Sequence, residues 1–198
     1  FGLKKSLFNY MHGICFEYDL QDWFEFKIPK TKIAPDFIAT AVFETADFTL
    51  KPISKIIWIG NLPIVDYFIK SKIRYTDYFN VLIYNIETKT WDKSSNLKIP
   101  RVNSTAVCYD DKIYVIGGEI GFYTYTDTIE MLDTTDPEAE WVILEVKMNE
   151  QKSNVSAVIY ESDDDISIYI ISGRNITGIL FTIEKYILNK QYWKNNEK

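Results

Sequence analysis

Few residues of this chain have the types and spacing that catalysis or metal binding requires. His12 is the only histidine among the 198 residues, and the pattern around it supports neither a Ser-His-Asp triad nor a multi-histidine metal site. Cys15 and Cys108 lie in separate apolar runs, and neither has a CxxC partner. We therefore interpret His12 as a surface or packing residue and both cysteines as buried, reduced thiols, with a single disulfide left open.

Two turns could suggest ligand-binding loops, but each lacks part of the required motif. The pair Gly117-Gly118 is not followed by the Lys-Ser/Thr of a phosphate-binding loop, and it favours a strand end instead. The run Asp163-Asp164-Asp165 lacks the glycine and the downstream glutamate of a calcium loop, and it favours a solvated hairpin tip. These patterns predict no cofactor and no metal site.

Charge and hydropathy narrow the class of partner. The chain has 22 Lys and Arg against 28 Asp and Glu, a net charge of −6. An acidic chain lacks the electrostatic footprint of a nucleic-acid-binding protein and should be repelled by anionic membranes. No run approaches the roughly 18 consecutive apolar residues of a membrane-spanning helix. The sequence therefore predicts neither a nucleic acid nor a membrane as partner.

The beginning of the chain leaves one question open. It starts at Phe1 and shows no basic segment followed by an apolar one, so we expect part of the natural N-terminus to be missing. Glycosylation triplets begin at Asn103, Asn154 and Asn175. Whether they are used depends on a signal peptide upstream, so their glycosylation stays open.

The spacing of the tryptophans indicates an internal repeat. Four strand-like runs end in tryptophan, at intervals of 68, 50 and 52 residues: Trp23, Trp91, Trp141 and Trp193. In three of these runs an aromatic residue lies seven positions earlier: Phe16, Tyr84 and Tyr186. A large side chain at a regular interval is typical of a wedge between stacked sheets.

Each interval contains further strand markers. An Ala-Val pair opens an apolar run at residues 41, 106 and 157, a polar turn follows, and the next apolar run ends at Gly60, Gly118 or Gly173. The run Ile113-Tyr-Val-Ile has no polar alternation, which predicts a strand that is buried on both faces. A glycine at the strand end permits a positive φ and the close approach of a neighbouring backbone.

The combined pattern resembles the Kelch repeat, whose period is about 50 residues. The best copy runs from Pro100-Arg101 through Ala106-Val107 and the double glycine to Trp141. The resemblance implies an all-β fold, a β-propeller of four-stranded antiparallel blades that is present only in part, as about three complete repeats and a partial one. We expect a partial blade at 1–33, a divergent repeat at 34–95, the best repeat at 96–146 and a C-terminal repeat at 147–198.

What the resemblance implies about function is protein recognition without catalysis. Similar Kelch domains are the substrate-binding halves of BTB-Kelch adaptors for cullin-RING ubiquitin ligases, which predicts a cytoplasmic platform for a protein or peptide, with further domains outside this chain. An actin-associated or other cytoskeletal Kelch protein and a secreted Kelch effector stay open. A propeller enzyme is less favoured, because the copper site of galactose oxidase, which has this fold, needs several histidines.

The resemblance also indicates a binding surface. In similar propellers the residues just before the inner strand line the mouth of the channel, and Asn103 and Asn154 hold that position; a strand cap or turn is the alternative. A period-matched repeat should bring equivalent positions to one rim, beside the charged groups that follow the Gly-ended strands. The predicted binding residues, none of them catalytic, are Arg101, Asn103, Ser104, Glu119, Asn154 and Arg174.

Overall fold

The computed structural model describes residues 2–5, 11–17, 22–28, 39–46, 52–59, 81–188 and 192–195. Within these residues the secondary structure consists of β-strands, with no helix. The chain divides into two compact units, residues 1–35 and 36–198. The predicted all-β class is confirmed.

The first unit contains a three-stranded antiparallel sheet. Its strands are β1 (Gly2–Lys5), β2 (Met11–Glu17) and β3 (Asp22–Ile28), in that spatial order. Trp23 lies opposite Phe16 in the β2–β3 register, as Trp91 lies opposite Tyr84 further along the chain. His12 and Cys15 belong to β2, and their side chains lie outside the described part of the chain, so our interpretations of them stay predictions.

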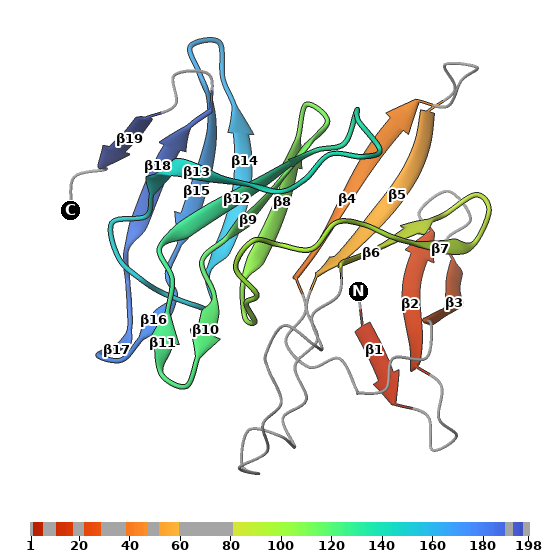
Figure 1. Ribbon diagram of the computed structural model, residues 1–198, viewed down its shortest axis with the longest axis horizontal. Helices are drawn as coiled ribbons and strands as arrows, with labels where there is room; N and C mark the ends of the chain where they lie inside the picture. The colour runs from red at the N-terminus through yellow and green to blue at the C-terminus, as the bar shows by residue number, and fades with distance from the viewer. Residues whose placement is uncertain are drawn as a thin grey trace. The chain divides into compact units, whose positions relative to one another are not determined.

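Within the described residues, the second unit contains three consecutive four-stranded antiparallel sheets, which we call the first, second and third blades (Figure 1). The first blade has β4 (Ala39–Ala46), β5 (Pro52–Ile59), β6 (Val81–Asn85) and β7 (Thr90–Lys93). The second has β8 (Thr105–Tyr109), β9 (Lys112–Ile116), β12 (Thr128–Asp133) and β13 (Val142–Lys147). The third has β14 (Ser156–Glu161), β15 (Ile166–Ile171), β18 (Ile183–Ile187) and β19 (Tyr192–Asn195).

The first strand of each blade is the inner one. Strand β8 contacts both β4 and β14, so the three first strands lie side by side while the later strands fan outward. Between their second and third strands, the second and third blades each carry a short hairpin, β10 (Glu119–Gly121) with β11 (Thr124–Tyr125), and β16 (Arg174–Asn175) with β17 (Gly178–Ile179). The predicted partial propeller of four-stranded antiparallel blades is confirmed.

Apolar side chains between the blades form two cores. Alternate residues of β9 face opposite ways: Ile113 and Val115 belong to the core between the first and second blades, and Tyr114 and Ile116 to the core between the second and third. Because both faces of this strand are buried, it contains no polar alternation. Trp141 is fully buried in the first core and donates its indole N–H to the carbonyl of Ser95 over 2.9 Å, which makes it a wedge between sheets.

The polar turns take the positions that the sequence indicated. Gly117 and Gly118 follow β9, and Asp163 and Asp164 are exposed at the turn between β14 and β15. Gly60 lies outside the described residues. Within the described ranges, no group of three or more His, Cys, Asp or Glu side chains could hold a metal ion, and no helix is long and apolar enough to cross a membrane.

Cys108 is a half-buried free thiol on β8. Burial, aided by the nearby carboxylate of Asp111, raises the pKa of this thiol to about 11. Burial also raises the pKa of Tyr114 to about 12. Weaker charge interactions contribute to this rise, and the largest of these is with Tyr186. Both groups bind their protons more tightly in the folded protein than in the unfolded chain.

The protein is therefore expected to lose stability in alkali. A cysteine in the unfolded chain has a pKa near 9, whereas that of Cys108 in the folded protein is about 11. The stability that this difference contributes is fully present below pH 9 and is lost as the pH rises through about 11. The free energy of unfolding, measured in urea with a reducing agent, should fall between pH 9 and pH 11. The variant Cys108→Ala should show a shallower fall over that interval; an unchanged slope would contradict the assignment to Cys108.

Candidate functional site

The candidate site is built where the second and third blades meet, at the end of the sheets that carries the two hairpins. The segment before each inner strand pairs with the first strand of its own hairpin. Val102 and Glu119 exchange two backbone hydrogen bonds of 2.9 and 2.7 Å, and Ser153 and Arg174 exchange two of 2.9 and 2.8 Å. Equivalent positions of two repeats thus receive the same backbone pairing.

Asn103 and Asn154 join these two segments. The backbone N–H of Asn154 donates to the carbonyl of Asn103 over 2.8 Å, although 51 positions separate the residues in the chain. The two residues adopt the left-handed conformation, with φ of 55° and 54°. Asparagine tolerates this region better than most residues. The expected neighbourhood of the two asparagines is therefore present, and each also lies at a bend of the chain just before the inner strand.

Five of the six predicted binding residues lie at this rim. Asn103, Ser104 and Glu119 are half-buried, while Asn154 and Arg174 are exposed. The Asn103 side-chain amide points to the Glu119 carboxylate, with Nδ2 and Oε2 3.5 Å apart. Amide, carboxylate and guanidinium groups of two repeats therefore share one surface. Their role in binding stays a prediction.

Arg101 does not lie on the exposed rim that we expected for it. Its side chain is fully buried beneath the rim and pairs with Glu130 of β12, with Nη2 and Oε1 2.5 Å apart. The guanidinium also donates to the carbonyls of Ile99, Gly117 and Thr128. Burial lowers the pKa of Arg101, and the adjacent Glu130 opposes that shift. Arg101 therefore supports the rim from below and does not reach a ligand directly.

The third blade repeats this arrangement with a residue that the sequence analysis missed. Lys152 is buried and forms an ion pair with Glu184 of β18, and its ammonium lies 3.2 Å from the hydroxyl of Thr182. Both glutamates also accept backbone N–H groups, Glu130 from Lys98 and Ile99, and Glu184 from Asn149. The signal was present in the sequence, because Lys152 follows Arg101 by 51 residues, as Asn154 follows Asn103.

Two glycines beneath the rim, Gly118 and Gly173, lie where a neighbouring backbone segment comes too close for a side chain. Gly118 has a φ of 115°, and a Cβ at this position would lie 2.9 Å from the carbonyl oxygen of Val102. Gly173, its equivalent in the third blade, has a φ of 123° and would bring a Cβ within 3.1 Å of the Ser153 carbonyl oxygen. The pairing between each hairpin and the segment before the inner strand therefore requires glycine.

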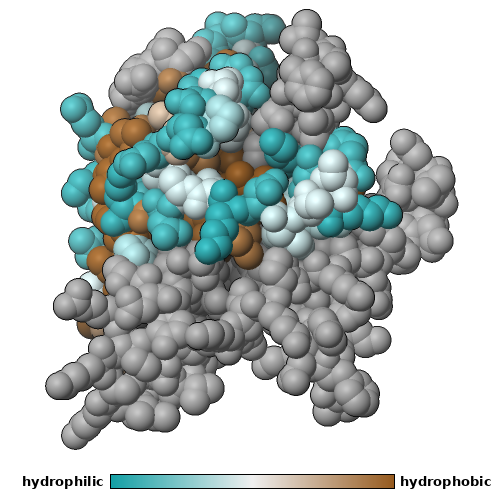
Figure 2. Space-filling model, turned by 45° about the vertical axis from the view of Figure 1, so that its right-hand side comes forward, coloured by the Kyte–Doolittle hydropathy of each residue, from teal (hydrophilic) through white to brown (hydrophobic). Residues whose placement is uncertain are grey.

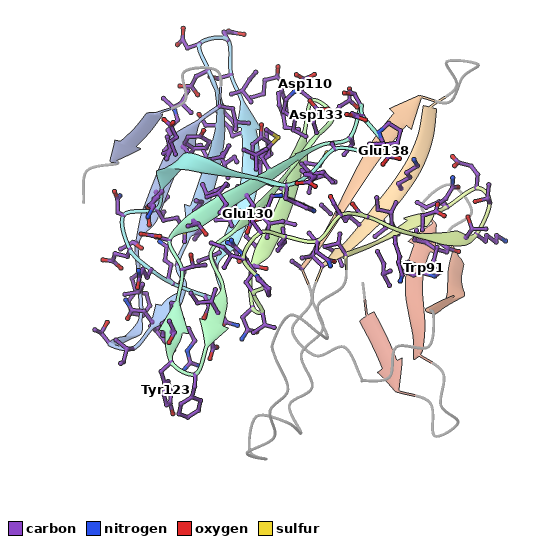
Figure 3. The ribbon with its side chains drawn as sticks, in the orientation of Figure 1. Trp91, Asp110, Tyr123, Glu130, Asp133 and Glu138 are labelled. Carbon is purple, nitrogen blue, oxygen red and sulfur yellow. The ribbon has the colours of Figure 1, made fainter. Side chains whose placement is uncertain are left out.

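The hairpins carry exposed apolar side chains next to this polar rim. Tyr123 lies at the outer tip of the β10–β11 hairpin (Figure 3), beside Phe122, whose ring centroid is 4.2 Å away. On and after the β16–β17 hairpin, the exposed apolar residues include Ile176, Ile179 and Phe181, the last 90% exposed. On the face drawn in Figure 2, most of the described residues are hydrophilic, and hydrophobic residues show between the hydrophilic ones. The sequence analysis did not select these tips, because a short stretch of apolar residues in a turn has the same composition as a short strand.

The arrangement offers recognition chemistry. Asparagine amides can pair with a peptide backbone, Arg174 and Glu119 can attract side chains of opposite charge, and the apolar tips can bury a partner's apolar residue. Among the described residues, the rim contains neither a cysteine nor a histidine.

Comparisons with known proteins agree with this geometry. The family description "Kelch motif" matches residues 100–144, which run from the segment before β8 into β13. The protein named Kelch repeat protein M-T8 of Myxoma virus (strain Lausanne) is 26% identical to this chain over 113 residues. The alignment covers 57% of this chain and 19% of the viral protein, so the chain spans about a fifth of that relative.

Proposed function

Because this chain is a Kelch-repeat protein, we propose that the rim shared by its second and third blades binds a protein or peptide partner. Kelch repeats generally mediate protein–protein interactions. The observation that carries the proposal is the hydrogen bond from Asn154 to Asn103, which brings equivalent polar positions of two repeats to one surface. Loops held on a rigid scaffold often carry function.

The chemistry of the rim favours an extended peptide segment as the bound element. Glu119 and Arg174 present both signs of charge, which suits a polypeptide better than a uniformly charged phosphate backbone. Each lies on the first strand of a hairpin, and each hairpin carries exposed apolar residues at its tip. A segment that crosses the two hairpins could therefore use polar contacts for register and apolar contacts for affinity.

A narrower proposal is that the chain is the substrate-recognition part of a cytoplasmic cullin-RING ubiquitin-ligase adaptor. The resemblance to BTB-Kelch proteins motivates it. An upstream BTB domain with a helical linker in the gene, together with co-purification of a cullin, would support the adaptor role. Sedimentation with filamentous actin would favour a cytoskeletal protein, and an upstream signal peptide would favour a secreted effector.

The binding proposal can be tested with paired rim substitutions. Asn154→Gly combined with Arg174→Ala should weaken binding of a peptide selected on the wild-type chain by more than about 1 kcal/mol, because both residues are exposed and glycine keeps the left-handed backbone. The dissociation constant is measured by isothermal titration calorimetry, with peptides selected from a random-peptide display library.

The matched control lies at the opposite end of the third blade. Asp163→Ala combined with Asp164→Ala alters two exposed residues of the β14–β15 turn, whereas the rim hairpin follows the other end of β15. This variant should bind as the wild type does. If the control loses affinity and the rim variant does not, recognition takes place at the other end of the blades.

A further inference from the structure

The strand registers make two positions on the outer strands of the three blades equivalent. In each blade the third strand has a residue just after the partner of the second strand's last residue, and these residues are Leu82, Glu130 and Glu184. Opposite them on the outer strands β7, β13 and β19 lie Lys93, Ile143 and Asn195. One residue earlier on the same strands come Asp92, Val142 and Lys194.

At these two positions the second blade differs from the other two. The first blade carries the exposed pair Asp92-Lys93, and the third carries Lys194-Asn195. The second blade carries Val142-Ile143, whose side chains are 53% and 39% exposed. Strand β13 also has six residues, whereas β7 and β19 have four each. Proteins protect sheet edges with short strands and charged side chains, and this end of β13 has neither.

Strand β13 has a free hydrogen-bonding edge within the described residues. It comes first in the spatial order β13-β12-β9-β8, so the N–H and C=O groups on its outer side have no strand partner there. The register shift in its pairing with β12 lies between Thr128 and Glu130, whereas Val142 and Ile143 keep adjacent antiparallel partners. An incoming extended segment could therefore continue the sheet of the second blade.

A pocket of about 480 Å³ lies beside this edge, between the second and third blades. Residues 142–146 of β13 line it, and the third blade contributes Ile166, Tyr186 and Leu188. Met131 of β12 is a further lining residue, and a flexible methionine can adapt its shape to an inserted group. The mainly apolar lining suits a large aliphatic or aromatic side chain.

The charged residues of the pocket are mainly acidic. Asp110 and Glu145 line it, and Figure 3 shows Asp110 at the end of the second blade opposite the β10–β11 hairpin. Asp111, the next residue along the chain, is exposed. Lys112 is the basic member of the lining, and its ammonium lies 3.9 Å from the Asp110 carboxylate. The remaining negative charge would attract a lysine or arginine of a bound segment.

We propose that β13 and this pocket form a second binding site, which takes an extended segment of a partner protein. The segment pairs with the outer edge of β13 as a fifth strand of the second blade, and one of its large apolar side chains enters the pocket. A lysine or arginine of the segment faces Asp110 and Glu145. In strand addition of this kind the main-chain hydrogen bonds supply affinity and the pocket supplies selectivity.

This inference does not depend on the proposed rim site, because the pocket contains none of the residues predicted for the rim. Charge also favours a partner protein over a second copy of the chain. Pairing β13 with β13 of another copy would bring the Glu145 carboxylates of both copies onto one sheet, and each chain has a net charge of −6. Like charges across an interface oppose association.

The site can be tested on the 198-residue chain that carries Asn154→Gly and Arg174→Ala, so that the result does not depend on the rim. A display library of random peptides is selected on this variant, and the dissociation constants of the enriched peptides are measured by isothermal titration calorimetry. The peptides should alternate apolar and polar residues and contain lysine or arginine. Adding Val142→Asp and Ile143→Lys, the residue types of the first blade, should weaken their binding about tenfold or more.

The matched control makes the same changes of residue type on an exposed hairpin. Ile176→Asp with Ile179→Lys alters two apolar side chains that are 75% and 70% exposed. This variant should bind the selected peptides with an unchanged dissociation constant.

A second measurement leaves β13 unaltered. The backbone of a selected peptide is N-methylated one residue at a time. Methylation should weaken binding about tenfold at every second residue and have little effect at the residues between, because alternate N–H groups of a paired strand point to its neighbour.

Three results would overturn the proposal. The first is that no enriched peptide depends on Val142 and Ile143, or that N-methylation shows no alternation. The second is that Ile176→Asp with Ile179→Lys abolishes binding, which would assign the peptides to the hairpin tips. The third is a dimer of the wild-type chain in sedimentation velocity that Val142→Asp with Ile143→Lys dissociates, because the occupant of the edge would then be a second copy.

Discussion

Replacing Glu130 by alanine is expected to destabilise the protein by about 3–5 kcal/mol, which is the usual cost of removing one partner of a buried ion pair. The side chains of Arg101 and Glu130 are fully buried, so water cannot solvate the remaining guanidinium. The variant also leaves two backbone N–H groups, those of Lys98 and Ile99, without their acceptor. Urea unfolding followed by tryptophan fluorescence should report the loss.

Two control variants show whether the loss of stability in Glu130→Ala comes from the burial of the ion pair. Lys98 and Glu140 form an ion pair with side chains 46% and 72% exposed, and Glu140→Ala should destabilise the protein far less than Glu130→Ala because solvent screens the pair. Combining Arg101→Met with Glu130→Leu removes both charges, so it should cost less than Glu130→Ala alone. If Glu130→Ala proves as mild as Glu140→Ala, the buried pair does not hold the segment before β8 to the second blade.

The sequence predicted the blades because their pattern is local. Strand β9 could be identified from four consecutive apolar residues, and Trp141 from its place in the repeat. The same pattern did not reveal how far each tryptophan is buried. Trp91 is half-buried and packs on Tyr84, with ring centroids 4.9 Å apart, whereas Trp141 is enclosed by two blades. Burial depends on the neighbouring blade, which the residues around a tryptophan do not specify.

The location of the candidate site could be predicted from the sequence, but the burial of its residues could not. Equivalent spacing placed Asn103 near Asn154, and the structure joins them by a hydrogen bond. Arg101 was placed on the same surface, although it is buried, because its partner Glu130 lies 29 positions away on another strand. A pairing of this kind depends on the register of β12 against β9, which sequence spacing alone does not provide. A comparison of the two repeats would have identified Lys152 as the equivalent of Arg101.

Gly118→Ala is the second substitution with a large expected effect, at least about 3 kcal/mol of lost stability, from backbone strain and overpacking together. The φ of Gly118 is 115°, a conformation that alanine rarely adopts, and the added Cβ would lie 2.9 Å from the carbonyl oxygen of Val102. That carbonyl accepts the Glu119 N–H over 2.7 Å, so it cannot move away without breaking the pairing that holds the β10 hairpin to the rim.

Gly178 is the matched control, because it isolates the backbone conformation from the close approach. Its φ is 122°, but a Cβ at this position would meet no atom within 4 Å. Gly178→Ala should therefore cost only the strain of its conformation, about 1–2 kcal/mol in an exposed hairpin that can adjust. The difference between the two variants, measured by urea unfolding, gives the contribution of the close contact with Val102. Equal losses would show that conformation alone requires glycine beneath the rim, and that the Val102 carbonyl can retreat from a side chain at Gly118.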